Sequence, residues 1–408
     1  MPQPGSGIHV DSNAMSVVQS PVESDPIVEP TITASPNGES LARFAWVDIL
    51  RGLSAFGVVL FHSRVDLYAG WNEIRANPAA YSAFDRLGAY LSLPLSFLGS
   101  GVMLFFLLSG FCVHYPYANG RKQFAGKEYA ARRFLRIYLP YIAVIAFTLL
   151  AEWAAKSIAS FEPSTTSTVV RSALMIQNYG PNAGQMTGNP SLWSLPVEIE
   201  LYAVYPIFLW LLRKYSVKAA LSVTATVSAL AGIAMLSSGT FPHGGFLPFW
   251  AMWCFGAAMA EWAATGRLPQ WRSAYWLLAA SSLLVAIGAQ LKVTHPMAAQ
   301  YAWAVFFSIV LLFGLTSASV RDWSLGSKAG RLAAFGAITY SLYLVHFPVL
   351  RVLGALWTNF VGEKSGNLLV PVTGALLCIP VAILFYRLIE KPSHEISRRA
   401  GKALETSP

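Results

Sequence analysis

The chain has 408 residues, of which 55% are hydrophobic and only 12% are charged, and its mean hydropathy is +0.48. Soluble domains average about 25% charged residues, so the composition excludes an ordinary soluble protein and indicates a membrane protein. The formal net charge of +9 requires no nucleic-acid partner, because basic residues gather in the loops between apolar stretches.

Residues 1–42 differ in composition from the rest of the chain. They are rich in proline, serine and acidic residues, and no lysine or arginine precedes Arg43. A secretory signal needs a basic start followed by an apolar stretch, and both are missing here. The segment is therefore predicted to be a disordered tail.

Ten apolar stretches of roughly membrane-spanning length follow this tail. They predict an all-α membrane protein, a polytopic bundle of about ten transmembrane helices over a membrane domain at 43–392, with a short cytoplasmic tail at 393–408. The second stretch is expected to break near Gly99–Gly101. The predicted spans are 46–63, 88–115, 137–154, 193–212, 217–237, 246–264, 274–291, 299–318, 332–354 and 368–389.

Basic residues in the loops predict the orientation of the bundle. With the N-terminus in the cytoplasm, 20 of the 29 lysines and arginines fall on the cytoplasmic side. Eight fall on the opposite side, and Arg51 lies within the first span. Since cytoplasmic loops are enriched in basic residues, both termini are predicted to be cytoplasmic.

The three cysteines, Cys112, Cys254 and Cys378, all lie in apolar runs without metal-ligand spacing. They are predicted to be buried, structural and unpaired, and no metal site is expected.

The first apolar stretch, "ILRGLSAFGVVLFHS", holds two residues that are costly in a bilayer, Arg51 and His62. Eleven residues separate them, so they share one helix face about 16 Å apart along the axis. Asp48 is positioned to pair with Arg51. The structural alternative is a snorkelling arginine and a hydrogen-bonded interior histidine. The functional alternative is a base that takes a proton from a hydroxyl.

Three further motifs carry candidate site residues. "RRFLR" places Arg133 and Arg136 on one face at the start of the third span, as a membrane anchor or as a phosphate clamp. "SLWSLPVEIELY" places Glu198 and Tyr202 on one face of a helix that should begin at Ser194 as its N-cap. The carboxylates of this motif, Glu198 and Glu200, either stabilise the start of the helix or belong to the functional site.

"ITYSLYLVHFPV" contains Tyr340, Tyr343 and His346, whose spacing fits one broad helix sector that core packing would also occupy. "GVMLFFLLSGF" contains Ser109 and Gly110, which favour close helix packing over a direct chemical role.

These motifs, together with "LIEKP" at the last span, occur in the order found in a known family. Over residues 43–392 the chain resembles the acyltransferase 3 family of integral membrane O-acyltransferases. That resemblance implies transfer of an acetyl or other short acyl group from cytoplasmic acyl-CoA to a hydroxyl of a saccharide or related acceptor. It also implies a bacterial cytoplasmic membrane protein without a permanently bound cofactor, which uses acetyl-CoA or another acyl-CoA as co-substrate.

The resemblance assigns roles to the motif residues. His62 would be the catalytic base, Arg51 a required cation, and Arg133 and Arg136 the ligands of the CoA phosphates. Glu198 and Tyr202 would serve the acceptor, with Glu198 also counted as catalytic. Possible supporting residues are Asp48, Ser109, Tyr340 and His346.

Two matters stay open at this stage. His62 either deprotonates the acceptor for direct attack or carries the acyl group transiently. Interior charges among ten helices would also suit a transporter or flippase for a lipid-linked saccharide, although such proteins often show repeated halves, which are missing here.

Overall fold

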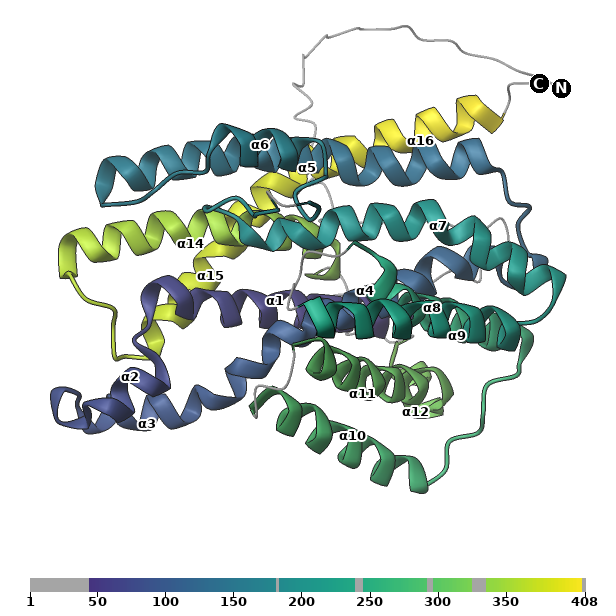
Figure 1. Ribbon diagram of the computed structural model, residues 1–408, viewed down its shortest axis with the longest axis horizontal. Helices are drawn as coiled ribbons and strands as arrows, with labels where there is room; N and C mark the ends of the chain where they lie inside the picture. The colour runs from purple at the N-terminus through teal and green to yellow at the C-terminus, as the bar shows by residue number, and fades with distance from the viewer. Residues whose placement is uncertain (1–43, 181–182, 239–244, 292–295, 325–334, 406–408) are drawn as a thin grey trace, which may run out of the picture.

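The computed structural model describes residues 44–180, 183–238, 245–291, 296–324 and 335–405. The described chain is almost entirely helical (Figure 1), and it forms no strand beyond one isolated bridge between Tyr68 and Ser365. The predicted all-α class is therefore confirmed. The segment 1–42 lies outside the described residues.

The long helices are α1 (Ala45–Leu67), α4 (Gly101–His114), α5 (Gly126–Ile158), α7 (Ser194–Lys214), α8 (Val217–Ser238), α9 (Leu247–Thr265), α10 (Ala274–Leu291), α11 (Pro296–Thr316), α14 (Thr339–Val361), α15 (Leu369–Phe385) and α16 (Lys391–Glu405). Shorter helices connect them, namely α2 (Gly70–Ala76), α3 (Ala83–Leu91), α6 (Thr166–Ala173) and α12 (Ala318–Ser324). Tight 3-10 turns form at Pro78–Ala80, Leu93–Ser100, Tyr115–Gly120 and Pro190–Trp193, and a π-helical turn forms at Tyr386–Glu390.

Nine helical segments of the described chain are long and apolar enough to span a membrane. All ten predicted stretches form helices in their described parts, and residues 332–334 of the ninth stretch lie outside the described chain. The stretch missing from these nine is α9, most of which is buried and which carries Glu261. The predicted break in the second stretch is confirmed, because the 3-10 turn Leu93–Ser100 separates α3 from α4.

The bundle has two distinct ends (Figure 1). Helix α16 packs along the first half of α5 at one end, which we call the α16 end. Helices α2 and α3 lie at the opposite end, the α2 end. Residues 393–405, expected to be a tail, form most of α16, where the Ser397 hydroxyl donates to the Arg132 carbonyl oxygen at 3.2 Å.

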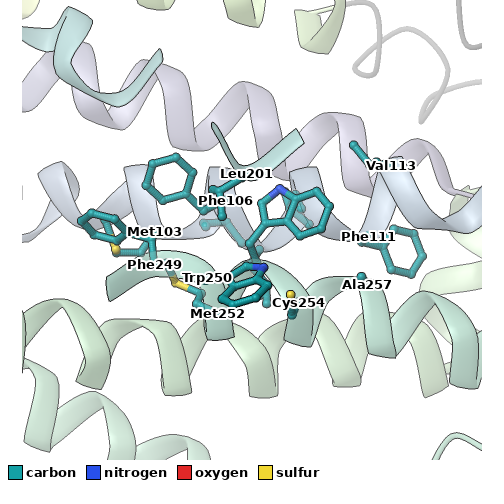
Figure 2. Close-up of a cluster of buried hydrophobic side chains, with 14 of the residues drawn as sticks. Met103, Phe106, Phe111, Val113, Leu201, Phe249, Trp250, Met252, Cys254 and Ala257 are labelled. Atoms are coloured by element: carbon teal, nitrogen blue, oxygen red, sulfur yellow. The ribbon is translucent and has the colours of Figure 1, made fainter. Parts of the chain in front are cut away.

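The centre of the core is the close crossing of α4 and α9. A Cβ atom at Gly110 would lie 1.9 Å from the Trp253 carbonyl oxygen, and one at Gly256 would lie 1.9 Å from the Leu107 carbonyl oxygen. The two backbones therefore touch, as small residues permit in membrane helix pairs. The side chains around this crossing come mainly from α4, α7 and α9 (Figure 2).

Two local predictions were wrong. Ser194 is not the N-cap of α7, because the 3-10 turn Pro190–Trp193 runs directly into the helix and Trp193 occupies the cap position. "RRFLR" does not lie at the start of its helix, because α5 already begins at Gly126. Its arginines lie within the helix and are partly buried.

Candidate active site

A pair of histidines joins α1 to α14. Nδ1 of His62 lies 3.0 Å from Nε2 of His346, and the two rings stack with centroids 5.1 Å apart. Nδ1 of His346 lies 2.6 Å from the carbonyl oxygen of Tyr343. The sequence placed these histidines 284 residues apart, so only the packing of α1 against α14 brings them together.

The hydrogen-bond partners fix the tautomer of each neutral ring. A carbonyl oxygen only accepts, so His346 must carry its proton on Nδ1 and accept through Nε2. His62 must then donate from Nδ1, which leaves the lone pair of its Nε2 without a partner among the described residues. The ring is thus held in the tautomer that a general base requires, with an orienting partner behind it.

The residues around His346 hold α14 in place. The hydroxyl of Tyr343 donates to the Ser191 carbonyl oxygen at 2.7 Å and contacts the Ser194 hydroxyl at 2.7 Å. At the start of α14, the carboxylate of Glu390 accepts from the Ser341 backbone N–H at 3.1 Å and from its hydroxyl at 2.5 Å. The "LIEKP" motif thereby caps the helix that carries His346.

Three arginines, Arg51, Arg133 and Arg136, lie together nearer the α16 end, and we call them the arginine group. Arg51 pairs with Asp48 at 3.5 Å, as the spacing predicted. The guanidinium of Arg133 lies over the rings of Tyr129 and Tyr202, 5.9 Å and 5.5 Å from their centroids. Arg136 lies close enough to Arg51 and Arg133 to interact with both electrostatically.

These cations differ from their neighbour Arg132 in their partners. Arg132 forms an ion pair with the buried Glu128 at 2.9 Å. Arg133 and Arg136 make no hydrogen bond or ion pair with any residue in the part of the chain that the structure describes. Unpaired guanidiniums inside a helical bundle are costly, so this group favours binding of an anion, with geometry suited to phosphate.

Glu198 and Tyr202 form a hydrogen-bonded group with Ser109. Oε1 of Glu198 accepts from the Tyr202 hydroxyl at 2.5 Å and from the Ser109 hydroxyl at 3.1 Å. The Trp253 indole donates to Ser109 at 3.2 Å. Ser109 therefore holds the carboxylate, while the adjacent Gly110 serves helix packing as predicted.

Glu198 and Tyr202, predicted to serve the acceptor, lie near the arginines in the structure. Helix α7 begins inside the bundle, with Ser194 beside Tyr343 of α14, and then runs toward the α16 end (Figure 1). Glu198 and Tyr202 therefore lie close enough to Arg51 to interact with it electrostatically. The reason is that the chain before α7 folds back into the bundle, where Gln177, Asn178 and Asn189 are buried.

Two other expectations had mixed outcomes. The Tyr340 hydroxyl donates to the Ile137 carbonyl oxygen at 3.0 Å, so it ties α14 to α5 and does not contact the histidine pair. Cys254 and Cys378 are buried and free as predicted, whereas Cys112 is free but exposed. Cys112 lies near Arg51.

Sequence reasoning missed two charged groups. Asp66 pairs with Arg351, and its position four residues after His62, on the same helix face, was the available signal. His114 bridges Tyr205 and Glu261 at 2.9 Å on each side, fully inside the bundle. No local pattern indicated this second group, because its members come from three different helices.

The described chain is a helical bundle with a hydrogen-bonded histidine pair and a group of interior arginines, an arrangement that suits an integral membrane enzyme. A family model described as an acyltransferase domain matches residues 44–387, and the chain belongs to this acyltransferase 3 family. It is also 27% identical over 289 residues to acyltransferase MdmB of Streptomyces mycarofaciens, over 66% of this chain and 73% of that protein. A comparison with solved structures found no match.

The protein is thus a membrane acyltransferase of this family. Family membership favours this activity over the transporter or flippase that the interior charges alone would also suit.

Proposed function

We propose that the protein transfers an acetyl or other short acyl group from acyl-CoA to a hydroxyl of a saccharide or related acceptor. The proposal rests chiefly on the chain of hydrogen bonds from His62 through His346 to the Tyr343 carbonyl oxygen. This chain leaves Nε2 of His62 as a base, which is the group that activation of a hydroxyl requires.

The arginine group supports acyl-CoA as the donor. Arg133 and Arg136 are unpaired among the described residues and would contact the phosphates of CoA. Arg51 lies eleven residues before His62 on α1, about 16 Å along the helix axis. An extended pantetheine arm running along this face would bring the thioester toward His62.

In the proposed step, the acceptor hydroxyl gives its proton to Nε2 of His62 while its oxygen attacks the thioester carbonyl carbon. The carbon–sulfur bond then breaks, and the departing thiolate takes the proton back from the imidazolium. An ester and free CoA result, and His62 returns to its starting tautomer. The lone pair of His346 Nε2 stabilises the transient imidazolium through the Nδ1–H of His62.

Glu198 and Tyr202 are reassigned in this proposal from the acceptor to the donor end. Tyr202 packs against Arg133, and Glu198 interacts with Arg51, so both would orient the cations that bind the donor. The bacterial cytoplasmic membrane is the proposed location, with acyl-CoA reaching the arginine group from the cytoplasm.

The direct test is transfer from radiolabelled acetyl-CoA in membranes that contain the protein. His62→Ala should abolish transfer, because no other group described here can take the proton, yet it should retain saturable binding of acetyl-CoA. Transfer at the wild-type rate in this variant would refute the assigned base. Mass spectrometry of surface glycans and secreted metabolites, with and without the gene, would identify the acceptor.

A further inference from the structure

A charged pair lies next to the histidine pair on the side of the α2 end. Asp66 follows His62 by one helical turn, about 6 Å further along the same face of α1. Its Oδ1 accepts from Nη1 of Arg351 on α14, and the two side chains are 16% and 18% exposed. Arg351 also donates from Nε to the Thr187 carbonyl oxygen at 3.2 Å.

Phe347 connects this pair to the histidines. Its ring centroid lies 4.4 Å from that of His62, and the Arg351 guanidinium lies 5.5 Å from the same Phe347 ring. Arg351 is also close enough to His62 to interact with it electrostatically. The buried Phe347 ring therefore lies between the histidine pair and the ion pair and contacts both.

The ion pair retains unused hydrogen-bonding capacity. Oδ2 of Asp66 is buried and has no hydrogen-bond partner among the described residues. Nη2 of Arg351 makes no hydrogen bond within the same part of the chain. Buried polar atoms are rarely left without a partner, and a purely structural ion pair gains nothing from an unsatisfied carboxylate oxygen.

We propose that Asp66 and Arg351 form the subsite that binds hydroxyls neighbouring the one that is acylated, so that the acceptor is a polyhydroxylated compound. This inference rests on the proposed function. Oδ2 of Asp66 accepts from one hydroxyl, and Nη2 of Arg351 donates to another.

The test compares two acceptor probes that share an alkyl chain, n-octyl β-D-glucopyranoside with several hydroxyls and 1-octanol with one. The purified wild-type protein and Asp66→Asn are assayed in lipid nanodiscs with radiolabelled acetyl-CoA. Asp66→Asn should raise the KM for octyl glucoside about tenfold, as expected for a lost hydrogen bond to a charged group. The KM for acetyl-CoA and transfer to octanol should not change.

Two further variants complete the design. Arg351→Lys keeps the positive charge but loses the planar guanidinium, whose Nη2 is free to donate while Nη1 holds Asp66, so it should also raise the KM for octyl glucoside alone. Glu73→Gln alters another carboxylate at the α2 end, one that accepts from the Tyr81 hydroxyl at 2.8 Å, and should leave all values unchanged.

Several results would overturn the subsite. One is an equal loss of transfer to octyl glucoside and to octanol in the subsite variants, and another is unchanged kinetics in both variants. A wild-type enzyme that acylates octanol as well as octyl glucoside, or acylates neither, would also overturn it. In each case saturable acetyl-CoA binding would leave the proposed donor intact. Absence of that binding in the wild type would instead refute the proposed function.

Discussion

His346 acts on His62 through a single hydrogen bond, so its contribution is one of position and tautomer. Nδ1 of His346 is committed to the Tyr343 carbonyl oxygen, and only Nε2 faces His62. Without an acceptor there, the neutral His62 ring would be free to place its proton on Nε2, where it cannot act as a base.

His346→Leu is therefore expected to lower kcat by roughly 10²–10⁴, the usual contribution of a positioned base. His346→Gln can place an amide oxygen where Nε2 was, so it should retain clearly more activity. Measurement of kcat and of the KM for acetyl-CoA in both variants checks this. Equal activity of the two variants would contradict the tautomer assignment.

Arg132 and Arg133 are adjacent in the sequence but have different surroundings. Arg132 is paired with Glu128 and packs against Gly401, whereas Arg133 stacks on Tyr202 and has no anionic partner among the described residues. The difference follows from their 100° separation around α5.

Arg133→Lys is expected to raise the KM for acetyl-CoA about tenfold, because lysine neither stacks on Tyr202 nor binds phosphate in a bidentate manner. Arg132→Lys keeps its ion pair with Glu128 and is the matched control, for which the KM should stay near the wild-type value. Steady-state kinetics at two salt concentrations measure both. A larger increase of the KM in Arg132→Lys than in Arg133→Lys would show that Arg132, and not Arg133, contacts the phosphate.

At the scale of helices, the packing of α4 against α9 holds Ser109 and its hydrogen-bond partner Glu198 in place. Ser109 binds Glu198 from the same turn of α4 whose Gly110 touches α9. Any separation of the two helices would therefore move the group that holds Glu198 and Tyr202.

Gly110→Ala is expected to destabilise the protein by about 2 kcal/mol or more, because the added carbon would meet the Trp253 carbonyl oxygen of a backbone that cannot rotate away. Gly288→Ala in α10 is the control, since no described residue lies within 4 Å of its added carbon. Thermal unfolding in detergent should show a lower Tm for Gly110→Ala alone. Equal Tm values would refute the close contact.

For the whole molecule, the site divides between the two ends of the bundle. The arginine group lies nearer the α16 end, and Asp66 with Arg351 lies toward the α2 end, with the histidine pair between them. The sequence assigns twenty basic residues to the cytoplasmic side, which predicts that the α16 end faces the cytoplasm.

Labelling with a membrane-impermeant maleimide tests this orientation. Asn77→Cys, in the exposed turn after α2, should react in intact cells, and Arg399→Cys on the exposed side of α16 should react only after permeabilisation. Each signal is corrected for labelling of the wild type, whose Cys112 is exposed. The reverse pattern would invert the predicted topology.

Much of the protein could be predicted from its sequence alone. Apolar length and helical period are local properties, so the helices, the break before Gly101 and the pairing of Asp48 with Arg51 followed from short-range spacing. The ordered motifs likewise identified the family that the comparison then established.

Only the tertiary structure decided which distant side chains meet. Helix packing joined His62 to His346 across 284 residues, and the chain before α7 folded into the bundle, which moved Glu198 and Tyr202 to the arginine group. Asp66 pairs with Arg351 of α14, a partner that its local sequence did not indicate. A sequence specifies the face on which a residue lies, but its depth and its partners depend on how whole helices pack, and that packing is not a local property.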